Sequence, residues 1–292
     1  MVAILASRLD ENAPGAFFVD TSCIDCDACR QVAPATFGRS RRRGQSVVVA
    51  QPAVGSEDEA RALMAVVACP TASIGTSPKR AAGHAIAAFP ERLEDDVYYC
   101  GWHSDASYGA ASYLIVRPSG NVLVDSPRAA RPLFERIAAL GGVATMVLSH
   151  RDDIADHDAF ARRFGCQRIM HAADAGDLPV ERRITGANRV PLDHDLTLIP
   201  VPGHTRGSVA ILYRDKFLFT GDHLWWDQDD ERLEMGRDVC WYSWADQVLS
   251  LRRLRDYRFQ WVLPGHGRRF RASSPPAMRA ALDEAIERIA AR

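Results

Sequence analysis

The sequence lacks a long apolar segment, an excess of charge and any repeated or low-complexity stretch. No segment approaches the roughly 18 apolar residues that a membrane helix needs, and residues 1–15 hold no basic stretch followed by an apolar run. With 36 basic and 37 acidic side chains, no global field attracts the chain to nucleic acid or anionic lipid. We therefore expect a cytoplasmic protein that acts on a small molecule, with neither nucleic acid nor a membrane as partner.

Cysteine is also scarce, and its seven copies are placed unevenly. Three of them form the run Cys23-x-x-Cys26-x-x-Cys29, a spacing that suits a metal centre better than disulfides. A fourth, Cys69, precedes a proline and follows a segment that favours a helix. The others are isolated, and we interpret them as core or bystander thiols rather than nucleophiles: Cys100, Cys166 and Cys240. This usage indicates a reducing compartment.

The chain divides into two regions of different pattern. Residues 16–76 contain the cysteine run, a strand-like segment at residues 46–50 and a helix opened by the capping box Ser56-x-x-Glu59. Residues 77–96 carry two prolines and mixed charge without clear periodicity, which is typical of a linker. Over residues 97–292, short apolar runs alternate with helical patterns, which predicts an α/β domain built on sheets. Helices are expected at residues 131–140, after His157, at residues 244–257 and after Pro275.

The first region resembles a bacterial-type ferredoxin, through the segment CIDCDACRQVAPATF and the remote Cys69-Pro70. The resemblance implies an α+β ferredoxin-like domain with one 4Fe-4S cluster, bound by the four thiolates that such a cluster needs: Cys23, Cys26, Cys29 and Cys69. Two-cluster ferredoxins have a further cysteine where this chain has Ala33, so a single cluster is implied. A zinc site is the alternative, although structural zinc sites usually pair their cysteines as two separated C-x-x-C units.

A basic loop lies beside this cysteine run, formed by Arg39, Arg41, Arg42 and Arg43. It would suit an acidic electron-transfer partner of the ferredoxin-like domain. A solvated turn is the alternative, because most charge runs are of that kind.

Potential metal ligands gather at the ends of strand-like runs in the second region. One loop holds four of them, and three further loops, PGHTRGS, FTGDHL and VLPGHG, hold one each beside a glycine. In chain order they are His150, Asp152, Asp156, His157, His204, Asp222 and His266. Imidazoles and carboxylates in such a cluster indicate a site for divalent metal ions.

These motifs, preceded by an SYLI…VLVD hairpin, resemble the metallo-β-lactamase superfamily over residues 98–270. The resemblance implies a four-layer αββα sandwich that binds two divalent metal ions, zinc or iron, at one sheet edge. It assigns His150, Asp152 and His204 to the first ion, Asp156, His157 and His266 to the second, and Asp222 to a bridging position.

The loop that begins at His150 departs from the usual motif in two ways. Asp152 stands where many members have histidine, and two additional residues separate it from Asp156. Asp153 is therefore a competing ligand. His223, next to a predicted ligand, is expected to support the site or pack in the fold rather than bind metal.

The resemblance favours a hydrolase, in which a metal-bound hydroxide attacks a small-molecule substrate. In such an enzyme Asp156 and Asp222 would orient the hydroxide. Only 26 residues follow His266, too few for the helical domain with which glyoxalase II binds glutathione. A non-haem di-iron oxidoreductase, flavodiiron-like or dioxygenase-like, is the first alternative, because two histidines and one carboxylate suit iron and a ferredoxin would supply electrons. A non-catalytic electron carrier or redox sensor is the second.

Overall fold

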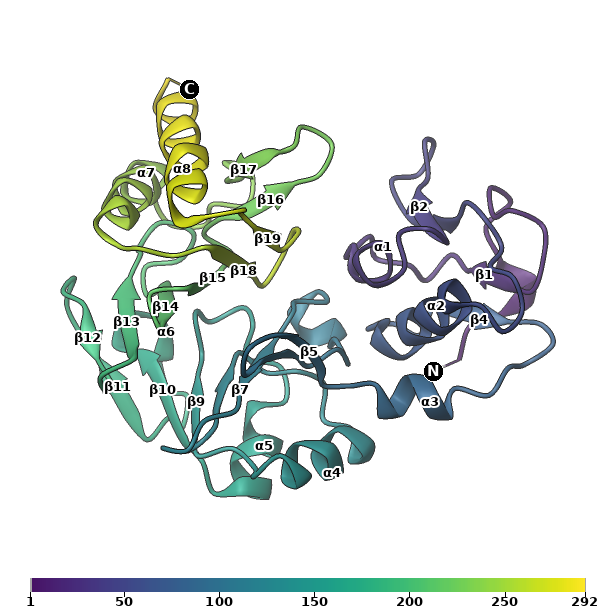
Figure 1. Ribbon diagram of the computed structural model, residues 1–292, viewed down its shortest axis with the longest axis horizontal. Helices are drawn as coiled ribbons and strands as arrows, with labels where there is room; N and C mark the ends of the chain where they lie inside the picture. Colours follow the sequence, from purple (N-terminus) through teal and green to yellow (C-terminus); the bar gives the residue numbers. More distant parts are fainter. Residues whose placement is uncertain (1, 292) are drawn as a thin grey trace. The chain divides into compact units, whose positions relative to one another are not determined.

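A computed structural model describes residues 2–291, which form two compact units (Figure 1). The first unit comprises the chain up to Val122, with Ser126–Val143 and Ala155–Phe164. The second comprises Leu123–Asp125, Ala144–Ile154 and the chain from Gly165 onward. Among the described helices, none combines the length and apolarity that crossing a bilayer demands.

The N-terminal part of the first unit consists of short strands and two helices. Its elements are η1 (Leu5–Ser7), β1 (Phe17–Val19), α1 (Ala28–Val32), β2 (Phe37–Arg39), β3 (Ser46–Val48), α2 (Glu57–Ala68) and β4 (Ile74–Thr76). The pairs β1–β4 and β2–β3 are antiparallel. The predicted capping residue is confirmed, since the Ser56 side chain accepts a hydrogen bond from the Glu59 amide and so satisfies a free donor of the first turn.

The remainder of the first unit begins with the segment at residues 77–96. Residues 77–96, predicted to be a linker, contain α3 (Gly83–Ala87) and β5 (Glu91–Glu94). The further elements are β6 (Val97–Tyr99), η2 (Asp105–Ser107), β7 (Tyr113–Ile115), the start of β8 (Val122–Val124), α4 (Arg131–Ala139) and α5 (His157–Phe164). Strand β6 pairs antiparallel with β5 and β7. Phe134 of α4 packs edge-on against Phe160 of α5, with ring centroids 4.8 Å apart.

The second unit contains two groups of paired strands. Parallel pairing joins β10 (Gln167–His171) to β9 (Thr145–Val147) and to β11 (Arg182–Ile184). The other group is a six-stranded sheet. In spatial order its strands are β12 (Val190–Pro191), β13 (Leu196–Pro200), β14 (Val209–Tyr213), β15 (Phe217–Gly221), β18 (Trp261–Pro264) and β19 (Phe270–Arg271). Its pairs are antiparallel except for β15 with β18, which are parallel. A hairpin joins β16 (Trp225–Asp227) to β17 (Arg232–Glu234).

Helices α7 (Trp244–Arg253) and α8 (Pro275–Ala290) lie together near the six-stranded sheet (Figure 1). The other helices of this unit are α6 (Ala172–Ala175) and η3 (Leu254–Asp256). Met278, Leu282 and Ile286 of α8 recur every four residues, so they share one face, and all three are buried in one apolar core with residues of the sheet. The expected helices from residues 131, 157, 244 and 275 are thus confirmed.

Candidate metal centre

Four strands of the second unit end one to four residues before candidate ligands. His150 follows β9, His204 follows β13, Asp222 follows β15 and His266 follows β18. Because these strands all end in loops that carry ligands, the two groups of paired strands bring together residues from distant parts of the sequence. Close backbone approach is needed here: a Cβ at Gly265 would lie 2.4 Å from Asp153 Oδ2 and 2.8 Å from Asp222 Oδ1.

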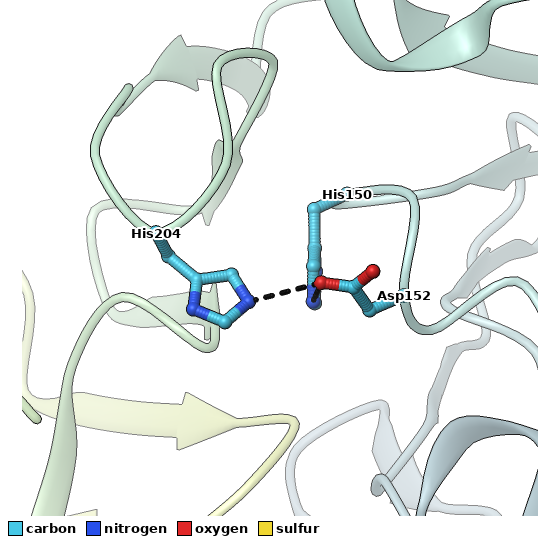
Figure 2. A group of neighbouring side chains, drawn as sticks. All are labelled: His150, Asp152 and His204. Atoms are coloured by element: carbon cyan, nitrogen blue, oxygen red, sulfur yellow. Dashed lines mark ion pairs between the residues drawn. The ribbon is translucent and has the colours of Figure 1, made fainter. Parts of the chain in front are cut away.

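One group of ligand atoms is formed by His150, Asp152 and His204 (Figure 2). The Oδ2 atom of Asp152 lies 3.3 Å from Nε2 of His204 and 3.9 Å from Nε2 of His150. The neighbouring His204 imidazole lowers the pKa of the Asp152 carboxyl. The two imidazoles are nearly perpendicular, with ring centroids 4.8 Å apart, and both are buried. Two imidazoles and a carboxylate therefore point to one position that an ion would fit.

A second group shares His150 and adds Asp153 and Asp222. Nε2 of His150 lies 3.6 Å from Asp222 Oδ2 and 3.9 Å from Asp153 Oδ2. His266 adjoins this group, with its Nε2 3.7 Å from Asp153 Oδ1 and 3.8 Å from Asp222 Oδ2. Asp222 Oδ2 is also 3.7 Å from Nε2 of His204. The same carboxylate oxygen thus lies near three imidazoles, as the predicted bridging position requires.

Burial without hydrogen-bond partners supports a metal at these groups. Nε2 of His150, both carboxylate oxygens of Asp153 and both ring nitrogens of His204 are buried and have no hydrogen-bond partner among the described residues. Such polar atoms are costly to bury, and native proteins normally satisfy them. Divalent cations bind these donors, so the residues present fit the metal that the ligand set implies.

The charges of the group are mutually dependent. Burial raises the pKa of Asp153 well above its usual value, and the neighbouring Asp222 raises it further. Burial also favours the neutral form of Asp222, but His266 and His150 outweigh it and hold the pKa of this carboxyl below its usual range. For His150, burial is the largest effect and lowers the pKa, yet Asp153 and Asp222 together raise it to about 10. Without a metal, a proton on His150 therefore offsets carboxylate charge that a cation would otherwise neutralise.

Neighbouring side chains position the loop that begins at His150. The Ser149 hydroxyl lies 2.9 Å from His150 Nδ1, and the Ser149 amide donates to Asp125 Oδ1 at 2.7 Å. Asp125 is buried, and this burial raises its pKa to about 6. Fixing the far nitrogen of a ligating imidazole orients the ring, which leaves Nε2 directed at the ion.

Asp174 connects two ligand loops. Its Oδ2 accepts from the Arg151 amide at 3.1 Å and from the Thr205 hydroxyl, and its Oδ1 accepts from the Gly207 amide at 2.7 Å. Arg151 lies between two candidate ligands, and Thr205 directly follows His204. No motif in the sequence marks Asp174; its position three residues after the end of β10 is the one available signal.

Asp156 and His157 lie in the first unit, at the start of α5. The Asp156 carboxylate accepts from the Ala129 amide at 2.6 Å, and its carbonyl accepts from the amides of Ala159 and Phe160. His157 is the first residue of α5 and is buried. Among residues 2–291, neither belongs to a group of three or more potential ligand atoms. Their predicted ligand and catalytic roles stay predictions, whereas Asp153, expected only as a competitor, lies in the second group.

The four predicted cluster cysteines line one small cavity in the first unit. Cys29 and Cys69 are buried, whereas Cys23 and Cys26 are half-buried. Burial raises the pKa of the Cys26 thiol to about 12, and burial raises the pKa values of Cys23 and Cys29 as well. A buried thiol with a raised pKa ionises only beside a cation, and the four cysteines around this cavity equal the number of ligands that a 4Fe-4S cluster needs.

Residues far beyond the cysteines in the sequence also contact the segments that carry them. A Cβ at Gly109, whose φ is +82°, would lie 2.5 Å from Cys26 Cβ. The amide of His103 donates to the carbonyl of Ala68, next to Cys69. The Arg128 guanidinium donates to the carbonyls of Val67 and Pro70, at 3.2 and 3.4 Å. These contributors carry no sequence signal, because their proximity to the cysteines arises only in the folded chain.

Two protein-family models match the chain. One, "4Fe-4S single cluster domain of Ferredoxin I", matches residues 19–76, and the other, "Metallo-beta-lactamase superfamily", matches residues 93–274.

Curated relatives and solved structures extend these matches. A hydroxyacylglutathione hydrolase of Anaeromyxobacter dehalogenans is 36% identical over 41% of this chain and 48% of its own length. Another of the same name, from Acidiphilium cryptum, is 32% identical over 39% of this chain and 48% of its own. The chain thus spans about half the length of these relatives.

A solved structure shows the fold. The crystal structure of the DIM-1 metallo-beta-lactamase exposed to ceftazidime matches with a TM-score of 0.50 and 16% identity, and the match covers 66% of this chain and 95% of that one. This similarity shows the expected α/β sandwich fold.

Proposed function

Because this chain belongs to the metallo-beta-lactamase superfamily, we propose that it is a metallohydrolase with a dinuclear metal site and a small-molecule substrate. One observation carries the proposal. Two groups of ligand atoms share the buried His150, and Asp222 lies within 3.8 Å of three imidazoles. Two ions held side by side are the arrangement that this pattern of donors suits.

The distances support a division of ligands between the two ions. His150, Asp152 and His204 would hold the first ion. Asp153 and His266 would hold the second, and Asp222 would contact both. This assignment keeps the first ligand set of the sequence analysis and replaces Asp156 and His157 by Asp153. We also propose that the sandwich has the four-layer αββα arrangement.

The chain's own residues would prepare the reaction in two ways. When bound, the metal ions supply a hydroxide nucleophile at neutral pH and stabilise the charge that develops in the substrate. Asp222 and Asp153 lie next to the imidazoles and can accept a hydrogen bond from that nucleophile, which would orient it. Asp152 is about two-fifths exposed and can exchange protons with solvent as the leaving group departs.

We propose a thioester as the substrate class. The two curated relatives are named for the hydrolysis of hydroxyacylglutathione, which is a thioester. Hydrolysis adds water across the bond between the acyl carbon and sulfur, and it yields a carboxylic acid and a thiol. No oxidant or reductant is consumed, so this reaction can proceed at a zinc site.

We further propose that the first unit binds one 4Fe-4S cluster through Cys23, Cys26, Cys29 and Cys69 in a ferredoxin-like fold. The match to a single-cluster family model supports this, as does the cavity that the four thiols line. The cluster would exchange electrons with a partner.

Assay of anaerobically purified protein tests the hydrolase. We expect two metal ions in addition to the cluster iron, hydrolysis of at least one member of a panel of acyl thioesters that includes S-lactoylglutathione and a thioester without glutathione, and loss of both the activity and one or more ions in His150→Ala. The matched control is His84→Ala, because His84 is an exposed histidine on α3 that belongs to no group of potential metal ligands among the described residues. A metal-loaded protein that cleaves no thioester contradicts the proposed activity.

Asp152 favours a second candidate, an iron-dependent oxidoreductase fed by the cluster. Two imidazoles and a carboxylate form the ligand set that non-haem iron often uses. If this candidate holds, Asp152→His should raise zinc occupancy relative to iron. Native protein that is expressed with adequate iron and still holds only zinc in the second unit would exclude it.

A further inference from the structure

Three consecutive arginines are exposed in the turn between β2 and β3. They are Arg41, Arg42 and Arg43, and none of them forms an ion pair within the described part of the chain. The full sequence has a net charge of −1, so this positive charge is local and does not reflect a basic protein. We call residues 39–45 the arginine loop.

The arginine loop is attached to the cysteine run. Arg39 Nη2 lies 2.8 Å from Asp25 Oδ2. The Gln45 side chain donates to the carbonyl of Cys23 at 2.6 Å and to that of Thr21 at 3.2 Å. Cys23 is one of the two half-buried cysteines among the four proposed cluster ligands, and the other, Cys26, is in contact with Gly109. A partner bound to the arginine loop would therefore lie beside the more open side of the cysteine cavity.

Among the described residues, no carboxylate pairs with Arg41, Arg42 or Arg43, although Asp25 neutralises Arg39. Asp25 pairs with both Arg30 and Arg39, and Asp27 pairs with Arg30. Glu11 accepts a hydrogen bond from Ser40. The acidic groups nearest the loop are thus already engaged.

The turn itself is held by contacts that do not need the exposed arginine side chains. The Ser40 hydroxyl accepts from the amides of Arg42 and Arg43, at 3.2 and 3.0 Å. The Ser40 amide donates to the carbonyl of Gln45 at 2.7 Å. Because backbone amides and Ser40 shape the turn, the three guanidinium groups are free to act on a partner.

We propose that the arginine loop docks an acidic one-electron donor protein that reduces the cluster of this chain. The inference rests on the cluster proposed above. One electron leaves the reduced centre of the donor and enters the cluster, so the donor is oxidised by one electron and no atom is transferred. Complementary charge raises association rates by about 10- to 1,000-fold, and salt weakens it as the Debye length falls from about 10 Å at 0.1 M to about 3 Å at 1 M.

Stopped-flow mixing of the full-length, cluster-loaded protein with a photoreduced flavodoxin, a small acidic flavoprotein, tests the proposal. The visible absorbance of the cluster reports its reduction. Arg41→Glu/Arg42→Glu should lower the second-order rate at low salt by about tenfold or more, with the difference vanishing near 1 M salt. The control Arg136→Glu/Arg162→Glu makes the same charge change at exposed positions on α4 and α5 and should leave the rate within about twofold of wild type.

A second variant and a small reductant keep the test decisive. Arg41→Gln/Arg42→Gln removes charge without adding acid and should give an intermediate rate, while reduction by dithionite should be unchanged in all variants. Equal slowing in the control, or an unchanged rate in the arginine-loop variants, overturns the proposal. If the arginine-loop variants keep the wild-type rate but lose binding to single-stranded DNA, the loop is assigned to nucleic acid. If they keep the rate but lose self-association at low salt, the loop is assigned to a second copy of the chain. A wild-type chain that assembles no reducible cluster contradicts the proposed cluster itself.

Discussion

The buried carboxylate of Asp153 lies beside His266, with its Oδ1 3.7 Å from the imidazole Nε2. Gly265 allows this approach, since any Cβ at that position would overlap Asp153. The contact joins the loop after β9 to the loop after β18. It also distinguishes Asp153 from Asp156, which accepts a hydrogen bond from Ala129 in the first unit.

Asp153→Asn should remove the second metal ion. The change halves the carboxylate charge next to His266, and loss of a direct ligand should cost more than the 10- to 100-fold in metal affinity that supporting residues typically contribute. Metal content per chain after dialysis measures this, with Asp156→Asn as the matched control. If Asp156→Asn loses the ion while Asp153→Asn keeps it, the ligand set predicted from the sequence motif is the correct one.

Gly109→Ala should impair cluster assembly. The new Cβ would lie 2.5 Å from Cys26 Cβ, and the residue has a positive φ. Gly55→Ala is a suitable control, because Gly55 has a similar φ of +77° but nothing within 4 Å of the added atom. Both variants carry the strain of about 1–2 kcal/mol that an L-residue meets in this region, so only the contact with the cysteine differs. Equal cluster absorbance in the two variants would refute the role assigned to Gly109.

Asp174→Asn should weaken metal binding without removing a ligand. Its carboxylate holds both the Arg151 amide and the Thr205 hydroxyl, and an amide side chain can replace only part of this acceptor capacity. We expect about a 10- to 100-fold lower metal affinity, with activity restored at high metal concentration. Asp177→Asn, at an exposed position nearby in the sequence, serves as control. Unchanged affinity, measured by competition with a chelator, would show that Asp174 is dispensable.

The metal-free protein should lose stability as the pH rises. Neighbouring carboxylates, opposed by burial, raise the pKa of His150 from its usual 6.5 to about 10. A raised pKa means that the folded state holds the proton more tightly, so this contribution is fully present below pH 6.5 and is lost as the pH rises through 10. Thermal unfolding of chelator-treated protein between pH 6 and 10 measures it. His150→Gln should flatten the profile over this range, and a profile that keeps its slope in this variant would assign the effect to other groups.

The sequence by itself determined the features that depend on local spacing. Cys23, Cys26 and Cys29 lie in one short loop, so their proximity follows from the chain alone. The cap at Ser56 likewise involves only the first turn of α2. His204, Asp222 and His266 each follow a strand-like run, and strands of one sheet bring their ends together, which made these candidates recognisable without coordinates.

The tertiary structure decided the choices that depend on how side chains point within a loop. Asp152, Asp153 and Asp156 are equally acidic in the sequence, yet only the folded loop directs Asp153 toward His266 and Asp156 toward Ala129. Gly109 and Arg128 contact the cysteine-bearing segment across long stretches of chain. Such contacts arise from packing between segments remote in sequence, and local spacing carries no information about them.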